Sequence, residues 1–175
     1  MQRRRFLQVS AASVAGLGLG ACTEDGAPIP ARGQELGSLD EVRAAVAEGG
    51  GAWYVAESRA YVVEVADGDR DAVAAVVPDE VHPGLEAGFV ALFQQCPHLG
   101  CRVPFCQESG WFECPCHGSR FTPYGEMRRG PAESGMRYFP LAVEDGTLRL
   151  LPGSVDGIDA DDPVVDVEPR GPHCV

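Results

Sequence analysis

The sequence predicts a mainly β fold: a small antiparallel β domain with one short helix near its N-terminal end. From residue 53 onward, short runs of β-branched and aromatic residues alternate with turns rich in Gly and Pro. One earlier segment carries both a helix-start and a helix-stop signal. The length of 175 residues suits one domain with its own core. A large multidomain enzyme is therefore excluded.

Acidic residues outnumber basic ones in this chain. There are 26 Asp and Glu against 14 basic residues, all of them Arg, and the net charge is -12. A surface of this sign repels the phosphates of nucleic acids. A nucleic-acid-binding function is therefore excluded.

The first 22 residues have the order of an export signal. Three arginines, Arg3 to Arg5, precede a mildly apolar stretch, Val9 to Ala21, that is rich in Ala and Gly. The segment resembles a twin-arginine signal, whose route carries folded proteins and so suits a protein loaded with metal in the cytoplasm. Residues 19–22 look like a lipobox, which predicts a lipid anchor on Cys22. The alternatives are an uncleaved signal that serves as the anchor and a disordered basic tail.

Either anchor would attach the N-terminus to the membrane. We therefore expect the domain at the extracytoplasmic face of the bacterial cytoplasmic membrane.

The segments after the signal are assigned in order along the chain. Residues 23–37 contain several Gly and Pro and are expected to form a flexible tether. Ser38-Leu39-Asp40-Glu41 is a capping box that begins a short helix, which Gly49, Gly50 and Gly51 end. Asp145-Gly146 is the favoured two-residue hairpin turn, so the last two strands should pair. The predicted strands are Trp53 to Ala56, Tyr61 to Val65, Phe89 to Gln94, Trp111 to Glu113, Leu141 to Glu144 and Thr147 to Leu151.

These assignments place the β domain at residues 38–152. Within it, Asp67 to Gly88 is acidic and interrupted by Pro78 and Pro83, so we expect a surface excursion rather than core. Residues 153–175 are expected to be an acidic, Pro-rich tail.

Cysteine and histidine gather in the middle of the chain. Cys96 and His98 have the spacing C-x-H, and Cys114 and His117 have the spacing C-x-x-H. Two thiolates and two imidazoles make a four-ligand metal site. Pro and Gly beside each pair permit tight loops that place two side chains on one edge of the metal. An iron-sulfur cluster with these ligands accepts an electron more readily than one held by four cysteines.

The segment from Cys96 to Pro131 resembles the Rieske family, specifically its membrane-associated, high-potential branch of quinol oxidoreductase subunits. This resemblance implies a sandwich-like β domain with a cluster-binding subdomain of two loops at residues 96–132. It also implies one 2Fe-2S cluster, with Cys96 and Cys114 on one iron and His98 and His117 on the other. The motifs that carry the resemblance are Cys96-Pro97-His98-Leu99-Gly100-Cys101, Cys114-Pro115-Cys116-His117-Gly118-Ser119 and Gly130-Pro131-Ala132.

The same resemblance assigns roles to residues around the ligands. Cys101 and Cys116 would form a disulfide between the two loops, and Gly130-Pro131 would cover the cluster from a third side. Ser119 would donate a hydrogen bond to a bridging sulfur. Taken alone, Gly130-Pro131 and Ser119 read as ordinary turn residues. The position of Phe121 is often Tyr in the family, a departure that removes one donor and weakens the case for the usual high potential.

Two other chemistries use the same residue types. A structural zinc site is the first, but zinc does not require Cys101 and Cys116 at their positions. Nor does zinc require Leu99 beside the ligand His98, and we count Leu99 among the residues that surround the cluster. A redox-active dithiol at Cys114 and Cys116 is the second, but its spacing is C-x-C rather than C-x-x-C.

Two further cysteines, Cys106 and Cys174, remain after these assignments. In an oxidising compartment they suggest a second disulfide, which would hold the tail across the domain. Two independent thiols are the equal alternative. His82 and His173 have no partner at ligand spacing and are expected at the surface.

The expected function is electron transfer within a cytochrome bc-like quinol oxidoreductase. An exposed cluster would take an electron from a quinol and pass it to cytochrome b- or c-type subunits. His98 and His117 would be proton acceptors as well as ligands. The chain would not be catalytic alone, and no catalytic residue is assigned.

The alternative is the small Rieske subunit of an exported molybdenum oxidase of the arsenite oxidase type, whose cluster meets no quinol. A ring-hydroxylating oxygenase is disfavoured because the chain has no room for its catalytic iron domain. A soluble Rieske ferredoxin is disfavoured by the export signal.

Overall fold

The computed structural model describes residues 33–159 and 165–175. The predicted signal, the lipobox cysteine Cys22 and most of the predicted tether lie outside these residues. Within them, no helix is long and apolar enough to cross a membrane. The elements are, in order, β1 (Gln34–Ser38), α1 (Leu39–Glu48), β2 (Trp53–Val55), β3 (Ala60–Glu64), α2 (Arg70–Ala74), the 3-10 helix η1 (Asp79–Val81), α3 (His82–Glu86), β4 (Phe89–Phe93), β5 (Phe105–Cys106), β6 (Trp111–Glu113), β7 (Arg120–Phe121), β8 (Met127–Arg129), β9 (Tyr138–Phe139), β10 (Leu141–Glu144) and β11 (Thr147–Leu150).

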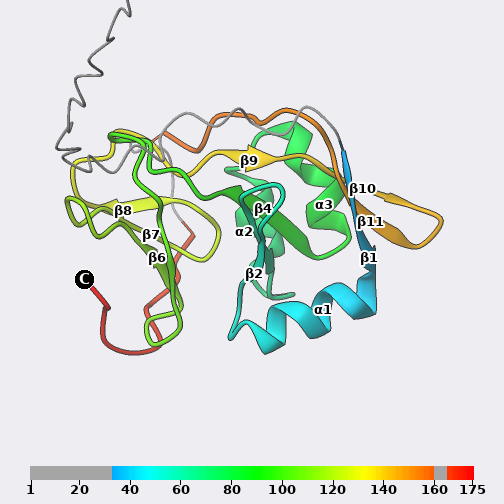
Figure 1. Ribbon diagram of the computed structural model, residues 1–175, viewed down its shortest axis with the longest axis horizontal. Helices are drawn as coiled ribbons and strands as arrows, with labels where there is room; N and C mark the ends of the chain where they lie inside the picture. Colours follow the sequence, from blue (N-terminus) through cyan, green and yellow to red (C-terminus); the bar gives the residue numbers. More distant parts are fainter. Residues whose placement is uncertain (1–32, 160–164) are drawn as a thin grey trace, which may run out of the picture.

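The strands form three small antiparallel sheets, which confirms the predicted mainly β class. Their orders are β1-β11-β10, β2-β3-β4-β9 and β5-β6-β7-β8. In Figure 1 the first sheet and α1 lie at one end of the molecule and the third sheet at the other, with the second sheet between them. All six predicted strands are present within a residue or two of their expected ends.

The central sheet β2-β3-β4-β9 is buried on both faces. Side chains alternate between the faces of a sheet, so neighbouring rows enter different cores. One row, Val62, Ala91 and Phe139, packs with α1 and the first sheet. The next row, Tyr61, Leu92 and Tyr138, packs with the third sheet. The sheet is therefore a platform that carries the third sheet on one face.

Helix α1 begins and ends where the sequence predicts. The backbone N–H of Ser38 donates to the Glu41 carboxylate at 2.8 Å, and the Glu41 N–H donates to the Ser38 hydroxyl at 3.3 Å, which completes the capping box. Val42 and Val46 are buried against the first core. Gly49 is the C-terminal cap.

The predicted tether is too long at its C-terminal end. Residues 34–37 belong to β1, which pairs with β11 and buries Leu36. A five-residue strand with one inward apolar side chain has too weak an alternation to be recognised in sequence. The folded domain therefore begins at least four residues before the predicted Ser38.

The acidic segment from Asp67 to Gly88 is part of the core, and its prediction as a surface excursion is wrong. It contains α2, η1 and α3, and it buries Val73, Val77, Val81 and Leu85 in the core cluster that it shares with the central and third sheets. These four residues are spaced by four, which is a helical period. This period was overlooked because each proline was interpreted as the end of a helix. Pro83, however, lies in the first turn of α3, where a proline is tolerated.

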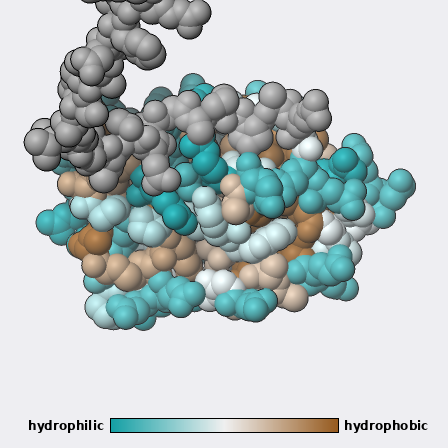
Figure 2. Space-filling view, viewed as in Figure 1, coloured by the Kyte–Doolittle hydropathy of each residue, from teal (hydrophilic) through white to brown (hydrophobic). Residues whose placement is uncertain are grey.

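The C-terminal part of the chain packs against the domain. Asp145 and Gly146 have the positive φ angles of a tight hairpin turn, which confirms the predicted pairing of β10 and β11. The tip of this hairpin, at the right of Figures 1 and 2, is hydrophilic. The segment after the hairpin is acidic in composition, as predicted, but it packs on the domain: Val155 forms a β-bridge with Tyr138, and Ile158 is buried.

Leu148 tests the first core. Leu148→Ala should lower the free energy of unfolding by about 2–5 kcal/mol, because this β11 side chain is fully buried in the core that also holds Val42 and Val46 of α1. Urea unfolding of the purified chain would measure this loss. Val143→Ala on the neighbouring strand is the matched control, since Val143 is exposed and should cost less than about 1 kcal/mol. Equal losses for the two variants would contradict this packing.

Candidate metal centre

Two loops of the same shape carry the predicted ligands. The first loop (residues 96–101) follows β4, and the second loop (residues 114–119) joins β6 to β7. Each is closed by two backbone hydrogen bonds in the same pattern. These bonds run from Cys96 N to Cys101 O (2.7 Å), Gly100 N to Cys96 O (2.9 Å), Cys114 N to Ser119 O (2.8 Å) and Gly118 N to Cys114 O (3.0 Å). The repeated pattern gives each loop a Cys at its start and a His near its tip.

A glycine makes each turn possible. Gly100 and Gly118 have φ angles of +83° and +75°, a left-handed conformation that side chains disfavour. An added Cβ on Gly118 would meet nothing within 4 Å, so the constraint there is the backbone angle and not space. Both loops can therefore turn sharply beside their histidines.

The two predicted ligand thiols are buried together. Cys96 and Cys114 are each 2% exposed, and they are the free cysteines of the described residues. The Cys96 sulfur accepts hydrogen bonds from the backbone of His98 and the hydroxyl of Ser119, and it contacts the Cys114 thiol. Burial raises the pKa of the Cys96 thiol to about 11, against the effect of the two donors. A metal that binds here must therefore displace thiol protons.

The two imidazoles lie toward the solvent side of the thiols. The rings of His98 and His117 meet edge to face with their centroids 4.8 Å apart. His98 is half-buried and His117 is exposed. Leu99, at the tip of the first loop, is 65% exposed. The centre thus has a buried sulfur side and an exposed nitrogen side.

A disulfide joins the two loops. It links Cys101 to Cys116, as the sequence resemblance implied. The sulfur atoms of Cys101, Cys116 and Cys114 all lie within 4.8 Å of one another. The crosslink therefore sits directly beside the buried thiols.

A third segment packs on the second loop. Gly130 has a φ angle of +109°, and an added Cβ there would lie 2.4 Å from the Ser119 Cα atom. The backbone N–H of Ala132 donates to the Ser119 hydroxyl at 3.2 Å, which leaves that hydroxyl's own proton for Cys96. Pro131 is exposed between them. The segment thus fixes the position of Ser119.

Phe121 is fully buried in the same apolar cluster as Cys96 and Cys114. Its ring carries no hydrogen-bond donor. The centre therefore offers two buried thiols and two imidazoles on the solvent side as metal ligands, and the Ser119 hydroxyl as a hydrogen-bond donor to sulfur. Two sulfur and two nitrogen ligands are the set that holds a mixed-ligand 2Fe-2S cluster, and the residues present fit such a group.

Comparison with known proteins agrees with this geometry. The family pattern described as Rieske [2Fe-2S] domain matches residues 52–140. The chain belongs to the Rieske family. A 2Fe-2S cluster is accordingly the cofactor of this Rieske domain.

Two curated relatives are iron-sulfur subunits of cytochrome b6-f complexes. Subunit 1 from Synechocystis sp. is 32% identical over 82% of this chain and 68% of its own length. Subunit 3 from Nostoc sp. is 40% identical, but that match spans only 36% of this chain and 35% of the Nostoc protein. The soluble domain of Rieske protein II from Sulfolobus acidocaldarius aligns over 85% of this chain and 89% of its own, with 17% identity and a TM-score of 0.49.

A second disulfide and a buried carboxylate lie behind the second loop. Cys106 is bonded to Cys174, so the structure has the disulfide and not the equal alternative of two independent thiols. His173 and His82, which were predicted at the surface, are both half-buried and have hydrogen-bond partners. His173 Nδ1 lies 2.7 Å from a Glu113 carboxylate oxygen, and His82 Nε2 lies 3.1 Å from the Ala74 carbonyl oxygen. Sequence reasoning missed Glu113, although an acidic residue inside a predicted strand and directly before a predicted ligand was a usable signal.

Phe121→Tyr and Ser119→Ala test the electrostatics of the centre. Reduction adds negative charge, so an added O–H donor to sulfur should raise the potential and a lost donor should lower it. A difference of about 1 kcal/mol between oxidation states corresponds to roughly 40 mV. Protein-film voltammetry of both variants at one pH would measure the shifts. A Phe121→Tyr potential equal to or below that of the wild type would mean that this ring does not face the cluster.

Proposed function

We propose that Cys96, Cys114, His98 and His117 hold the 2Fe-2S cluster, with the thiolates on one iron and the imidazoles on the other. The pairing is supported by the contact between the two thiols and by the edge-to-face contact between the two rings. When bound, the cluster supplies a one-electron carrier that accepts an electron more readily than a four-cysteine cluster does. The Ser119 hydroxyl then stabilises added negative charge on sulfur.

Electron transfer from a quinol to a cytochrome is the function that the site supports best. The observation that carries it is the unequal burial of the ligands, with both thiols 2% exposed and His117 open to solvent. A quinol that meets the imidazole edge could pass its proton to the outer ring nitrogen of a ligand imidazole, when that nitrogen is deprotonated, while the electron moves inward. Exposed Leu99 beside this edge offers apolar contact to a lipid-soluble substrate.

The relatives support a cytochrome-type partner. The Synechocystis and Nostoc proteins are subunits of cytochrome b6-f complexes. By analogy this chain is one subunit of a complex in which cytochrome b- or c-type subunits receive the electron. The chain itself would then carry charge and leave the remaining chemistry to its partners.

The N-terminal sequence supports a location outside the cytoplasm. Arg3 to Arg5 and the apolar stretch after them suit twin-arginine export, and Cys22 suits a lipid anchor. An anchor of this kind keeps the domain near its partners and raises its effective concentration.

Leu99→Ala tests the quinol reading. The substitution should lower quinol-dependent cytochrome reduction by membranes roughly tenfold, because removing the exposed apolar contact costs about 1.5 kcal/mol or more. Val143→Ala is the matched control, since Val143 is also an exposed apolar residue but lies on the β10–β11 hairpin. Its activity should equal that of the wild type.

An unchanged rate for Leu99→Ala would count against a quinol at this edge. Molybdenum in the purified complex, with no response to a quinol analogue, would favour the molybdenum oxidase subunit instead.

Cys22→Ala tests the anchor. The variant should fold and load iron normally but should appear in the soluble fraction after cell breakage, because it lacks the lipid. Immunoblots of washed membranes and supernatant would measure the distribution. Retention of the variant in the membrane fraction would instead indicate an uncleaved signal.

A further inference from the structure

The residue directly before the ligand Cys114 is a buried carboxylate. Glu113 is 1% exposed and ends β6. Its oxygens accept four hydrogen bonds, so the buried charge is well satisfied. The donors are Ser109 Oγ (2.6 Å), His173 Nδ1 (2.7 Å), Cys174 N (2.8 Å) and Val175 N (2.9 Å).

Three of these four donors come from the C-terminal strap, which we define as residues 165–175. The strap also reaches the other end of the second loop. Arg120, directly after Ser119, donates to the backbone oxygen of Val175. Arg120 is also the register partner of Glu113 across β6 and β7. Residues 173–175 therefore contact the positions on both sides of the second loop.

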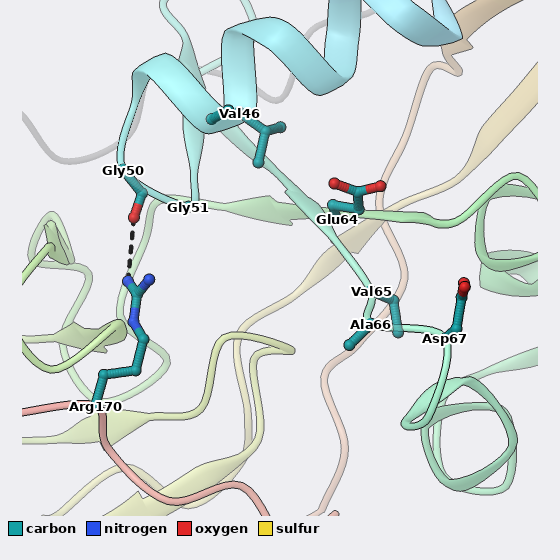
Figure 3. Close-up of a pocket in the computed structure, with 9 residues that line it drawn as sticks. Val46, Gly50, Gly51, Glu64, Val65, Ala66, Asp67 and Arg170 are labelled. Atoms are coloured by element: carbon teal, nitrogen blue, oxygen red, sulfur yellow. Dashed lines mark hydrogen bonds between the residues drawn. The ribbon is translucent and has the colours of Figure 1, made fainter.

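The strap is fastened to the domain along its length. The Cys106–Cys174 disulfide ties it to β5, and the Arg170 N–H donates to the Ser109 carbonyl at 2.8 Å. The Arg170 guanidinium donates to the Gly50 carbonyl at 3.1 Å, at the end of α1 (Figure 3). Figure 1 shows the strap running beside β6 and β7. The strap is thus a fixed support for the Glu113 carboxylate.

The second loop needs such support more than the first. The first loop follows β4, a five-residue strand in the middle of the central sheet. The second loop joins β6 and β7, which have three and two residues. Strands this short make few ladder hydrogen bonds and are weak anchors by themselves.

We propose that Glu113 is a positioning residue: by binding the strap it holds the second loop, and with it Cys114 and His117, in the geometry that the cluster requires. The proposal rests on the proposed function of Cys114 and His117 as ligands. It assigns a role to the C-terminal strap that the cluster motif alone does not give.

Glu113→Gln is the direct test, made in the full chain with its cluster. The amide nitrogen cannot accept hydrogen bonds, so some of the four donors lose their partner. We expect altered nitrogen couplings from the histidine ligands in the electron-resonance spectrum of the reduced protein. We also expect loss of iron to a chelator about tenfold faster than in the wild type.

Glu108→Gln is the matched control. Glu108 is an exposed acidic residue in the turn between β5 and β6, the strand that carries Glu113. Its replacement removes one negative charge near β6 but none of the hydrogen bonds to the strap, so it separates the effect of lost charge from the effect of lost hydrogen bonds. Nitrogen couplings and iron loss should match the wild type in this variant.

His173 provides a second test if Glu113→Gln does not accumulate. The His173 ring contacts Trp111 with 5.6 Å between centroids, and His173→Phe should keep this ring contact but removes the N–H donor. His173→Phe should change the nitrogen couplings as Glu113→Gln does. His173→Gln, which keeps an N–H donor, should have the couplings of the wild type.

The outcomes separate this proposal from the proposed function. A wild-type protein without a 2Fe-2S cluster would overturn the ligand assignment itself. The second outcome is a normal cluster in the wild type, with nitrogen couplings and iron loss unchanged in Glu113→Gln, or in His173→Phe if only that variant is obtained. This outcome would overturn only the role of Glu113.

Discussion

Two thiol sulfurs must be kept from water while two imidazoles beside them reach it, and the rest of the structure depends on this requirement. The burial of Cys96 and Cys114 comes from the apolar cluster between the central and third sheets. The exposure of His117 comes from its place at the tip of a tight loop that leaves the same cluster. A centre deeper in the core would lose contact with partners, and a shallower one would expose its sulfur to water.

The central sheet makes this arrangement possible in a small domain. Its two faces support separate cores, so the third sheet does not have to supply all of its own burial. Strands of two or three residues are stable there because they pack on a larger platform and are crosslinked. The binding loops are thus held chiefly by tertiary contacts and less by the strands that lead into them.

Much of the site could be predicted because its information is local. The ligand spacing, the capping box at Ser38 and the Asp145-Gly146 turn each lie within a few residues, and all three sequence signals led to correct structural elements or motifs. The helices at residues 70–86 were missed because their four-residue apolar spacing competed with acidic composition and two prolines. The partnership of Glu113 with His173 could not be read at all, because 60 residues separate the two in sequence and only the fold brings them together.

The two disulfides overlap along the chain, because Cys106 lies between Cys101 and Cys116 while its partner Cys174 lies beyond both. Every peptide bond between Cys101 and Cys174 is therefore spanned by at least one of the two crosslinks. A protease that cuts the backbone once in this stretch produces two pieces that remain one covalent molecule. Both loops of the metal centre would then stay attached to the same molecule after a single cut within this stretch.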